Sequence, residues 1–167
     1  MRAPHYKFPR AVLSVSLAVL ATTIVLSQSS RATQSSATTA NTPPSKNTLL
    51  YTNKTYGFRF TLPVSWKGYS IVKKKWGNGQ GPLILLRHPL WTAANPRQDI
   101  PIMVLTLAQW DLVQRGKLSV SAAPIGPDEL GRNRKYVLAL PPRYNFAFPT
   151  GYQEVQDILS HHPLQAF

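Results

Sequence analysis

The chain of 167 residues contains no cysteine and few acidic residues. Without cysteine it has no disulfide framework, no thiolate metal site, no cysteine nucleophile and no N-terminal cysteine for lipid attachment. It also lacks a glycine-rich phosphate loop, because Gly77-x-Gly79-x-Gly81 has neither the strand–helix setting nor the lysine of that motif. Ser65 precedes Trp66 without the glycine elbow that presents a hydrolase nucleophile, so a serine hydrolase is not indicated.

Basic residues outnumber acidic ones about three to one in the chain as a whole. There are 6 Asp and Glu against 19 Lys and Arg, a formal net charge of +13. Four of the basic residues lie in the first 32 positions, which leaves 15 basic and 6 acidic residues, or +9, from Thr33 onward. This excess favours an acidic partner, such as a nucleic acid, an anionic membrane surface or an anionic wall polymer. A charge that only keeps the domain soluble is the alternative.

The N-terminal segment has the organisation of an export signal. Residues 11–26 carry no charge and lie between a basic N-terminus and a short, mostly small and polar stretch. This order is typical of a secretory signal peptide, and the run is short for a membrane span, which needs about 20 apolar residues. Ser30 and Ala32 predict cleavage after Ala32, so residues 1–32 form a signal peptide or, if uncleaved, a membrane anchor. Both alternatives place the domain outside the cytoplasm.

Residues 33–47 are almost purely Ser, Thr, Ala, Asn and Pro. Such a segment buries too little apolar surface to offset its loss of conformational entropy, so we predict a disordered linker there. The folded domain is then expected over residues 48–167.

The strand predicted at Tyr56–Leu62 is the organising element of that domain. Tyr56, Phe58, Phe60 and Leu62 alternate with smaller or polar residues, which places four large apolar side chains on one face. Further strands are expected at residues 49–52, 69–76, 82–87, 101–107, 119–125 and 134–140, with turns at 126–128 and 130–133 and a short helix at 108–115. The runs at 82–87 and 101–107 are apolar without alternation, which indicates strands covered on both faces.

A helix is predicted near the C-terminus. Thr150 and Gln153 have the spacing of a capping box, and an apolar stripe follows at Tyr152, Val155, Ile158 and Leu159. With its short connections the chain therefore predicts an α+β fold: a central, mostly antiparallel sheet of six or seven strands covered by helices.

The pattern Tyr-Gly-Phe-x-Phe-x-x-Pro-x-x-Trp at residues 56–66 resembles the opening of the PsbP/Mog1-like superfamily. The late strand followed by a helix also agrees in outline, over residues 48–167. The resemblance implies an α/β/α sandwich and a binding or assembly role without catalysis. The segment 130–148 does not map onto that family, and the chain lacks the lipid-modified cysteine of some bacterial members.

Two basic runs form the first candidate site. A polyanion is expected to bind their cationic side chains, with the ring of the tryptophan stacking on the ligand. The residues are Lys73, Lys74, Lys75, Trp76, Arg132, Arg134 and Lys135. A solvated strand end and turn explain the same residues. No motif indicates a specific nucleic acid.

A second candidate is an aromatic segment beside a cation. Arg143, Tyr144, Phe146 and Phe148 lie in a predicted loop, where they offer a patch for a protein partner or pack beneath the C-terminal helix. A third candidate is a metal or hydrolytic site, which would need His88, Asp99 and one histidine of the pair at 161–162. The alternative is that these histidines are exposed or cap a helix.

These patterns predict an exported, non-enzymatic domain, without cofactor or bound metal, that binds a protein or envelope component. A polyanion-binding module is the alternative, and a hydrolase or metal enzyme comes third. Contact with a membrane is expected only through an uncleaved leader.

Overall fold

The computed structural model describes residues 47–122 and 124–167. The predicted leader, residues 1–32, lies outside the described residues, as does the predicted linker, residues 33–47, apart from Asn47. Both stay predictions. Within the described ranges, no helix is long and apolar enough to cross a bilayer.

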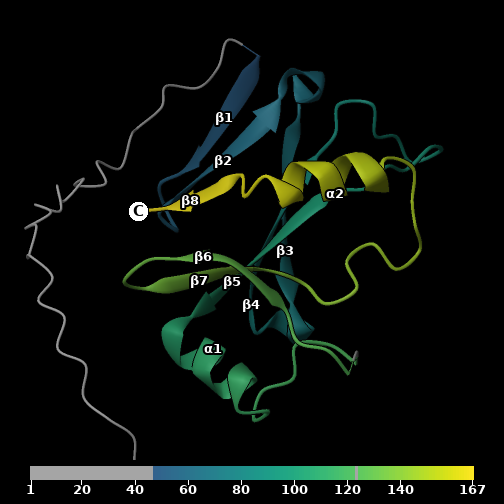
Figure 1. The fold of residues 1–167 in the computed structure, drawn as a ribbon. Coiled ribbons are helices and arrows are strands. Elements are labelled where there is room, and N and C mark those ends of the chain that lie inside the picture. Colours follow the sequence, from purple (N-terminus) through teal and green to yellow (C-terminus); the bar gives the residue numbers. More distant parts are fainter. Residues whose placement is uncertain (1–46, 123) are drawn as a thin grey trace, which may run out of the picture. The chain divides into compact units, whose positions relative to one another are not determined.

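A strand of alternating apolar residues forms the centre of a small antiparallel sheet (Figure 1). The sheet has the order β1-β2-β8, with β1 at Thr48–Asn53, β2 at Phe58–Pro63 and β8 at Leu164–Ala166. Phe58, Phe60 and Leu62 have no exposed surface, which confirms the predicted apolar face. Tyr56 lies in the turn before β2 and packs half-buried against the same core.

The larger sheet has five antiparallel strands in the order β3-β4-β5-β7-β6. Its strands are β3 at Ser70–Trp76, β4 at Gly81–Arg87, β5 at Ile100–Thr106, β6 at Asp128–Arg132 and β7 at Tyr136–Leu140. β4 and β5 carry unbroken apolar runs because both of their faces are covered. In β5, Ile102 and Val104 contribute to one core, and Met103 and Leu105 to the other.

Two apolar cores separate three layers. On one face of the larger sheet, the small sheet and helix α2 (Tyr152–Ser160) bury Trp66, Val155 and Ile158 among the strand residues. On the other face, helix α1 (Leu107–Gln114) covers a smaller core around Trp76. Figure 1 shows the larger sheet lying between the two helices. The chain is therefore α+β, as the sequence predicts.

The prediction of a single sheet of six or seven strands is wrong, since the eight strands of the described residues divide between two sheets. β8 was not expected, because only three residues after α2 pair with β2. β6 overlaps both of the turns expected in this region, at residues 126–128 and 130–133, and ends before Asn133. Gly131 follows a register shift in β6, and a side chain there would come within 3.1 Å of Leu164. The described residues of 119–125 form no strand, and Val120 packs against the smaller core around Trp76.

The two helices begin differently from expectation. α1 starts with a capping box in which Thr106 and Gln109 each accept the other's backbone N–H. The box predicted at Thr150 and Gln153 does not form, and Gly151 precedes α2 with a φ of 82°. The backbone of Thr150 instead contacts the loop between β4 and β5, where its carbonyl accepts the amide of Gln98 at 2.8 Å.

Candidate functional site

The side chain of Asn133 joins two turns that are far apart in the sequence. Its Nδ2 donates to the carbonyl oxygens of Tyr56 at 2.9 Å and Gly57 at 3.1 Å. Its Oδ1 accepts the backbone amides of Lys135 at 2.9 Å and Tyr136 at 3.0 Å. All four hydrogen-bonding positions of this amide are thus used. The β6–β7 turn is thereby held against the β1–β2 turn.

Gly57 makes this close approach possible. Its φ is 66°, and a Cβ built there would lie 2.6 Å from the carbonyl oxygen of Phe167 and 2.8 Å from Nδ2 of Asn133. The amide of Phe167 donates to the Gly57 carbonyl at 2.9 Å, so the last residue of the chain closes the same junction. Only glycine allows this conformation and this separation together.

Beside the junction lies a hollow of about 650 Å³, which we call the turn hollow. Four cationic side chains contribute to its lining: Lys54, Arg132, Arg134 and Lys135. The rings of Tyr56 and Tyr136 meet edge to face there, with centroids 5.4 Å apart. Arg132 is partly neutralised by Glu129, whose pKa is lowered by the hydrogen bond from that guanidinium.

A second hollow, of about 420 Å³, opens between the small sheet and β3–β4, and we call it the inter-sheet hollow. It shares Thr55 and Tyr56 with the turn hollow. Lys73 and Lys75 pair across the strands with Ile84 and Pro82, so their side chains lie on the core-facing side of the sheet. Lys74 also borders the hollow, but strand alternation directs its side chain to the opposite face with its partner Leu83, which packs on the smaller core.

The two predicted basic runs therefore meet around Tyr56. We call the set Lys54, Lys73, Lys75, Arg132, Arg134 and Lys135 the basic surface. Among the described residues, no aspartate or glutamate lines either hollow. Three other acids form ion pairs with arginines outside the surface: Asp99 with Arg87, Asp111 with Arg115 and Glu154 with Arg97. Even with Arg132 paired to Glu129, the surface therefore carries an excess of positive charge.

Trp76 does not belong to this surface. It is 5% exposed, and its indole Nε1 donates to the carbonyl of Val104 at 3.0 Å in the core beneath α1. A Cβ at Gly81 would lie 2.5 Å from that nitrogen, so the glycine leaves room for the ring. The expected stacking of Trp76 on a ligand does not fit this position.

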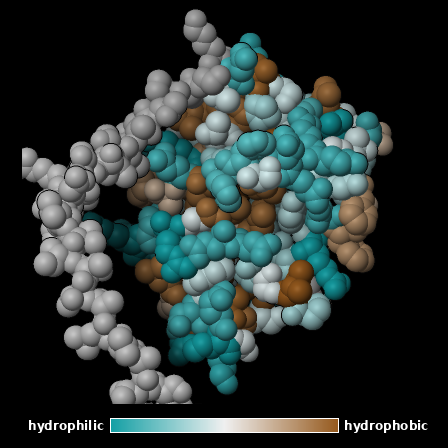
Figure 2. All heavy atoms as spheres, in the orientation of Figure 1, coloured by the Kyte–Doolittle hydropathy of each residue, from teal (hydrophilic) through white to brown (hydrophobic). Residues whose placement is uncertain are grey.

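The aromatic segment before α2 divides into a buried and an exposed part. Tyr144 packs against the main core, and burial raises the pKa of its phenol. Phe146 and Phe148 are 73% and 66% exposed, and the Arg143 guanidinium lies 5.7 Å from the Phe146 ring centroid. Figure 2 shows apolar side chains at the right-hand rim, over the loop that leads into α2. Arg143 and Phe148 both have a positive φ, of 55° and 44°.

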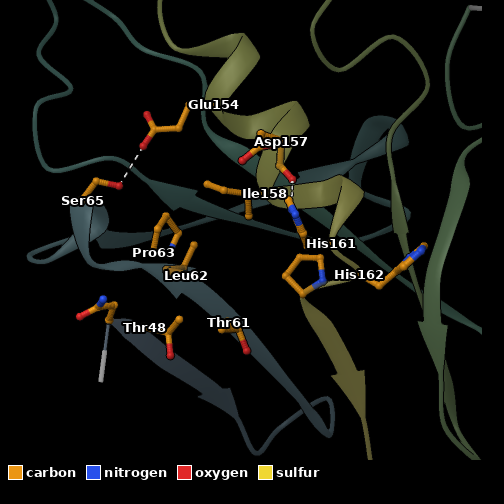
Figure 3. A pocket seen from close by; sticks show the side chains of 12 residues that line it. Thr48, Thr61, Leu62, Pro63, Ser65, Glu154, Asp157, Ile158, His161 and His162 are labelled. Atoms are coloured by element: carbon orange, nitrogen blue, oxygen red, sulfur yellow. Dashed lines mark hydrogen bonds between the residues drawn. The ribbon is translucent and has the colours of Figure 1, made fainter. Parts of the chain in front are cut away.

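A third feature is the carboxylate of Glu154, which Figure 3 shows pointing from α2 toward Ser65. The carboxylate accepts hydrogen bonds from Ser65 Oγ at 2.9 Å and from the indole Nε1 of Trp66 at 3.2 Å. It also lies 3.6 Å from Nη2 of Arg97. His88 Nε2 is 4.0 Å away. Ser65 and Glu154 line a hollow of about 560 Å³ between α2 and the small sheet.

This cluster lacks the geometry of a hydrolase. His88 Nδ1 accepts the amide of Leu90 at 3.1 Å, so Nε2 carries the proton and faces Glu154. The carboxylate thus stands between Ser65 and the imidazole, which has no free nitrogen to accept the hydroxyl proton. Burial, and then the charge of Arg97, lower the pKa of His88.

The structure does not gather the residues of the predicted metal alternative. Asp99 receives two hydrogen bonds from Arg87, at 2.8 and 3.1 Å, and His88 packs edge-on against Trp66. His161 Nδ1 lies 2.8 Å from the carbonyl of Asp157. Over residues 47–122 and 124–167, no three His, Asp or Glu side chains cluster in a way that suits a metal ion.

Sequence reasoning found both basic runs but not Asn133 or Tyr56, which bring them together. The Asn-x-x-Tyr spacing of a turn at residues 133–136 was the available signal, since asparagine commonly accepts backbone amides two or three residues ahead. Comparison with known proteins adds nothing to this geometry: no family model, curated protein or solved structure matches the chain.

Proposed function

We propose that the chain is an exported, non-enzymatic domain that binds an anionic polymer of the cell envelope through the basic surface. The observation that supports this most is the meeting of two separate basic runs at Tyr56, where their hollows share two residues. A polymer with anionic groups at intervals would contact both hollows at once. Release of its counterions would supply much of the affinity.

A structural explanation accounts for part of the surface. β3 is an edge strand, and lysines that point inward from an edge discourage pairing with another chain. This explains Lys73 and Lys75. It does not explain Arg134 and Lys135, which lie at the β6–β7 turn, or the side chain of Asn133, which holds that turn against the opposite sheet.

The finer fold assignment and the location are part of the same proposal. The five-stranded sheet, with a helix on each face, supports the PsbP/Mog1-like α/β/α arrangement that the segment at residues 56–66 suggests. Export rests on the charge and hydrophobicity pattern of residues 1–32. A binding role outside the cytoplasm agrees with both.

Titration of the full chain with inorganic polyphosphate at several salt concentrations tests the function. The logarithm of the binding constant should fall linearly with the logarithm of the salt concentration. The double variant Arg134→Gln/Lys135→Gln should bind more weakly, with a slope shallower by about one for each phosphate that the variant no longer neutralises. The control Lys67→Gln/Lys117→Gln removes the same charge at exposed positions outside both hollows. Equal weakening in the two double variants would contradict the proposal.

A protein partner at the exposed loop before α2 is a second candidate. It is supported by the exposure of Phe146 and Phe148 on a loop that Gln98 holds at both ends. The amide of Gln98 donates to the carbonyl of Thr150 at 2.8 Å, and its side chain donates to the carbonyl of Tyr144 at 3.4 Å. A photo-crosslinking residue at position 146 should give one discrete protein adduct when the chain is mixed with an envelope fraction. The additional substitution Phe148→Ser should abolish this adduct. The same probe at Leu107, which is 41% exposed on α1, is the control. Matching adducts from both positions would argue against this site.

A further inference from the structure

The inter-sheet hollow differs from the turn hollow in its walls. Its floor is apolar: Ile71 and Ile84 come from the larger sheet, with Tyr51 on the opposing small sheet. Ile84 is 2% exposed and belongs to the main core, so the hollow reaches the edge of that core. Its volume of about 420 Å³ lies within the range of about 300–1,000 Å³ that is usual for small-molecule sites.

Two ammonium groups continue this apolar floor. Ile71, Lys73 and Lys75 occupy alternate positions of β3, so their side chains follow one another along a single face. Their cross-strand partners are Leu86, Ile84 and Pro82 in the same order. The face thus changes from apolar to cationic within five residues.

Polar groups of the small sheet complete the hollow. Asn53 Nδ2 donates to the hydroxyl oxygen of Tyr51 at 2.9 Å, and both residues line the hollow. Burial raises the pKa of Tyr51, so its phenol stays protonated and can donate to a ligand oxygen. The hollow therefore combines apolar contact surface with donors and positive charge at its cationic end.

We propose that the inter-sheet hollow binds an anionic amphiphile. Its aliphatic chain lies along Ile71, Ile84 and Tyr51, and its phosphate or carboxylate head is held by Lys73 and Lys75. This inference deepens the proposed function and rests on the basic surface being a ligand site, because it gives the anionic ligand an apolar part. An amphiphile matches the hollow better than a purely ionic polymer does, since a polyphosphate chain would leave the apolar floor uncovered.

Photolabelling of the full chain with a dodecyl phosphate that carries a terminal diazirine tests the site. Adducts should map to peptides that contain Tyr51–Tyr56 or Ile71–Ile84. Hexyl phosphate should compete far more weakly than dodecyl phosphate, by roughly two- to fourfold in concentration for each methylene removed. A dodecanoate probe shows whether a carboxylate head is also accepted, and labelling of the hollow by either probe supports the site.

Variants separate this inference from the proposed function. Lys73→Gln/Lys75→Gln should reduce labelling at least tenfold, whereas Arg134→Gln/Lys135→Gln should change it less than twofold. If the hollow is labelled but polyphosphate does not bind, the proposed polymer-binding function is rejected and the amphiphile site is retained. Polyphosphate binding without labelling of the hollow would overturn the inference alone. Equal labelling by a neutral dodecyl maltoside probe would also overturn it, because the lysines would then have no role.

Discussion

Asn133 donates its side-chain amide to the carbonyl oxygen of Tyr56 across 2.9 Å, and so ties a turn of the larger sheet to a turn of the small one. The two residues are 77 positions apart in the sequence. The same side chain accepts two amides of its own turn, so it orders the turn and positions it. Both the domain's stability and the shape of the basic surface depend on this residue.

Replacement of Asn133 by alanine should lower the free energy of unfolding by about 2–4 kcal/mol. The part-buried carbonyl of Tyr56 and the part-buried amide of Tyr136 lose their partner, and each costs about 1–3 kcal/mol when left unsatisfied. The Gly57 carbonyl keeps the amide of Phe167, and the amide of Lys135 lies at the exposed side of the turn, so these two groups add little. Urea denaturation measures the change. Asn95→Ala, at an exposed position, is the control and should stay within about 0.5 kcal/mol of the wild type. A decrease below about 1 kcal/mol at Asn133 would show that the junction does not depend on its side chain.

Gly57 and Gly116 offer a matched comparison of backbone strain and steric overlap. Their φ values are 66° and 65°, but a Cβ at Gly116 meets no atom within 4 Å, whereas one at Gly57 overlaps two. Gly116→Ala should therefore cost about 1–2 kcal/mol from the left-handed conformation alone. Gly57→Ala should cost a further 1–3 kcal/mol or so from overlap. Equal melting temperatures for the two variants would contradict the close approach at Gly57.

Gly81→Ala should disturb the indole of Trp76. The new methyl group would lie 2.5–2.7 Å from ring atoms, so the indole must move and its hydrogen bond to Val104 must lengthen. We expect a destabilisation of about 1–3 kcal/mol and a change in tryptophan fluorescence. Gly126→Ala is the control, because a Cβ there meets nothing within 4 Å. Unchanged fluorescence in Gly81→Ala would place the ring elsewhere.

His88 should make the domain less stable below neutral pH. Its pKa is lowered in the folded state, mainly by burial, so the unfolded chain binds more protons once the pH falls toward about 6.5. Stability is therefore full above that pH and declines as the pH falls toward the lower pKa of the folded state. Denaturation at pH 7.5, 6.5 and 5.5 measures the slope.

The variant His88→Asn should reduce that slope, because asparagine does not titrate and its oxygen can still accept the amide of Leu90. His162→Asn changes an exposed histidine and should keep the wild-type dependence on pH. If His88→Asn retained the full slope, another group would be responsible for the destabilisation in acid.

Local patterns sufficed for the elements whose side chains repeat at a regular spacing. Phe58, Phe60 and Leu62 indicated a one-sided strand, and Val155 and Ile158 indicated the inner face of α2. The basic runs were equally visible, because charge is a property of composition. Such features depend only on neighbours along the chain, which determine strand and helix periodicity.

Long-range contacts account for what the patterns missed. Residues 164–166 are too few to show a period, and they form β8 only because β2 offers a free edge. Trp76 continues the lysine run in sequence, yet it is buried beneath α1, and its indole donates to the carbonyl of Val104, 28 positions away. The basic surface likewise exists because Asn133 reaches Tyr56. Pairing between distant segments is a property of the packed chain as a whole, so no local spacing encodes it.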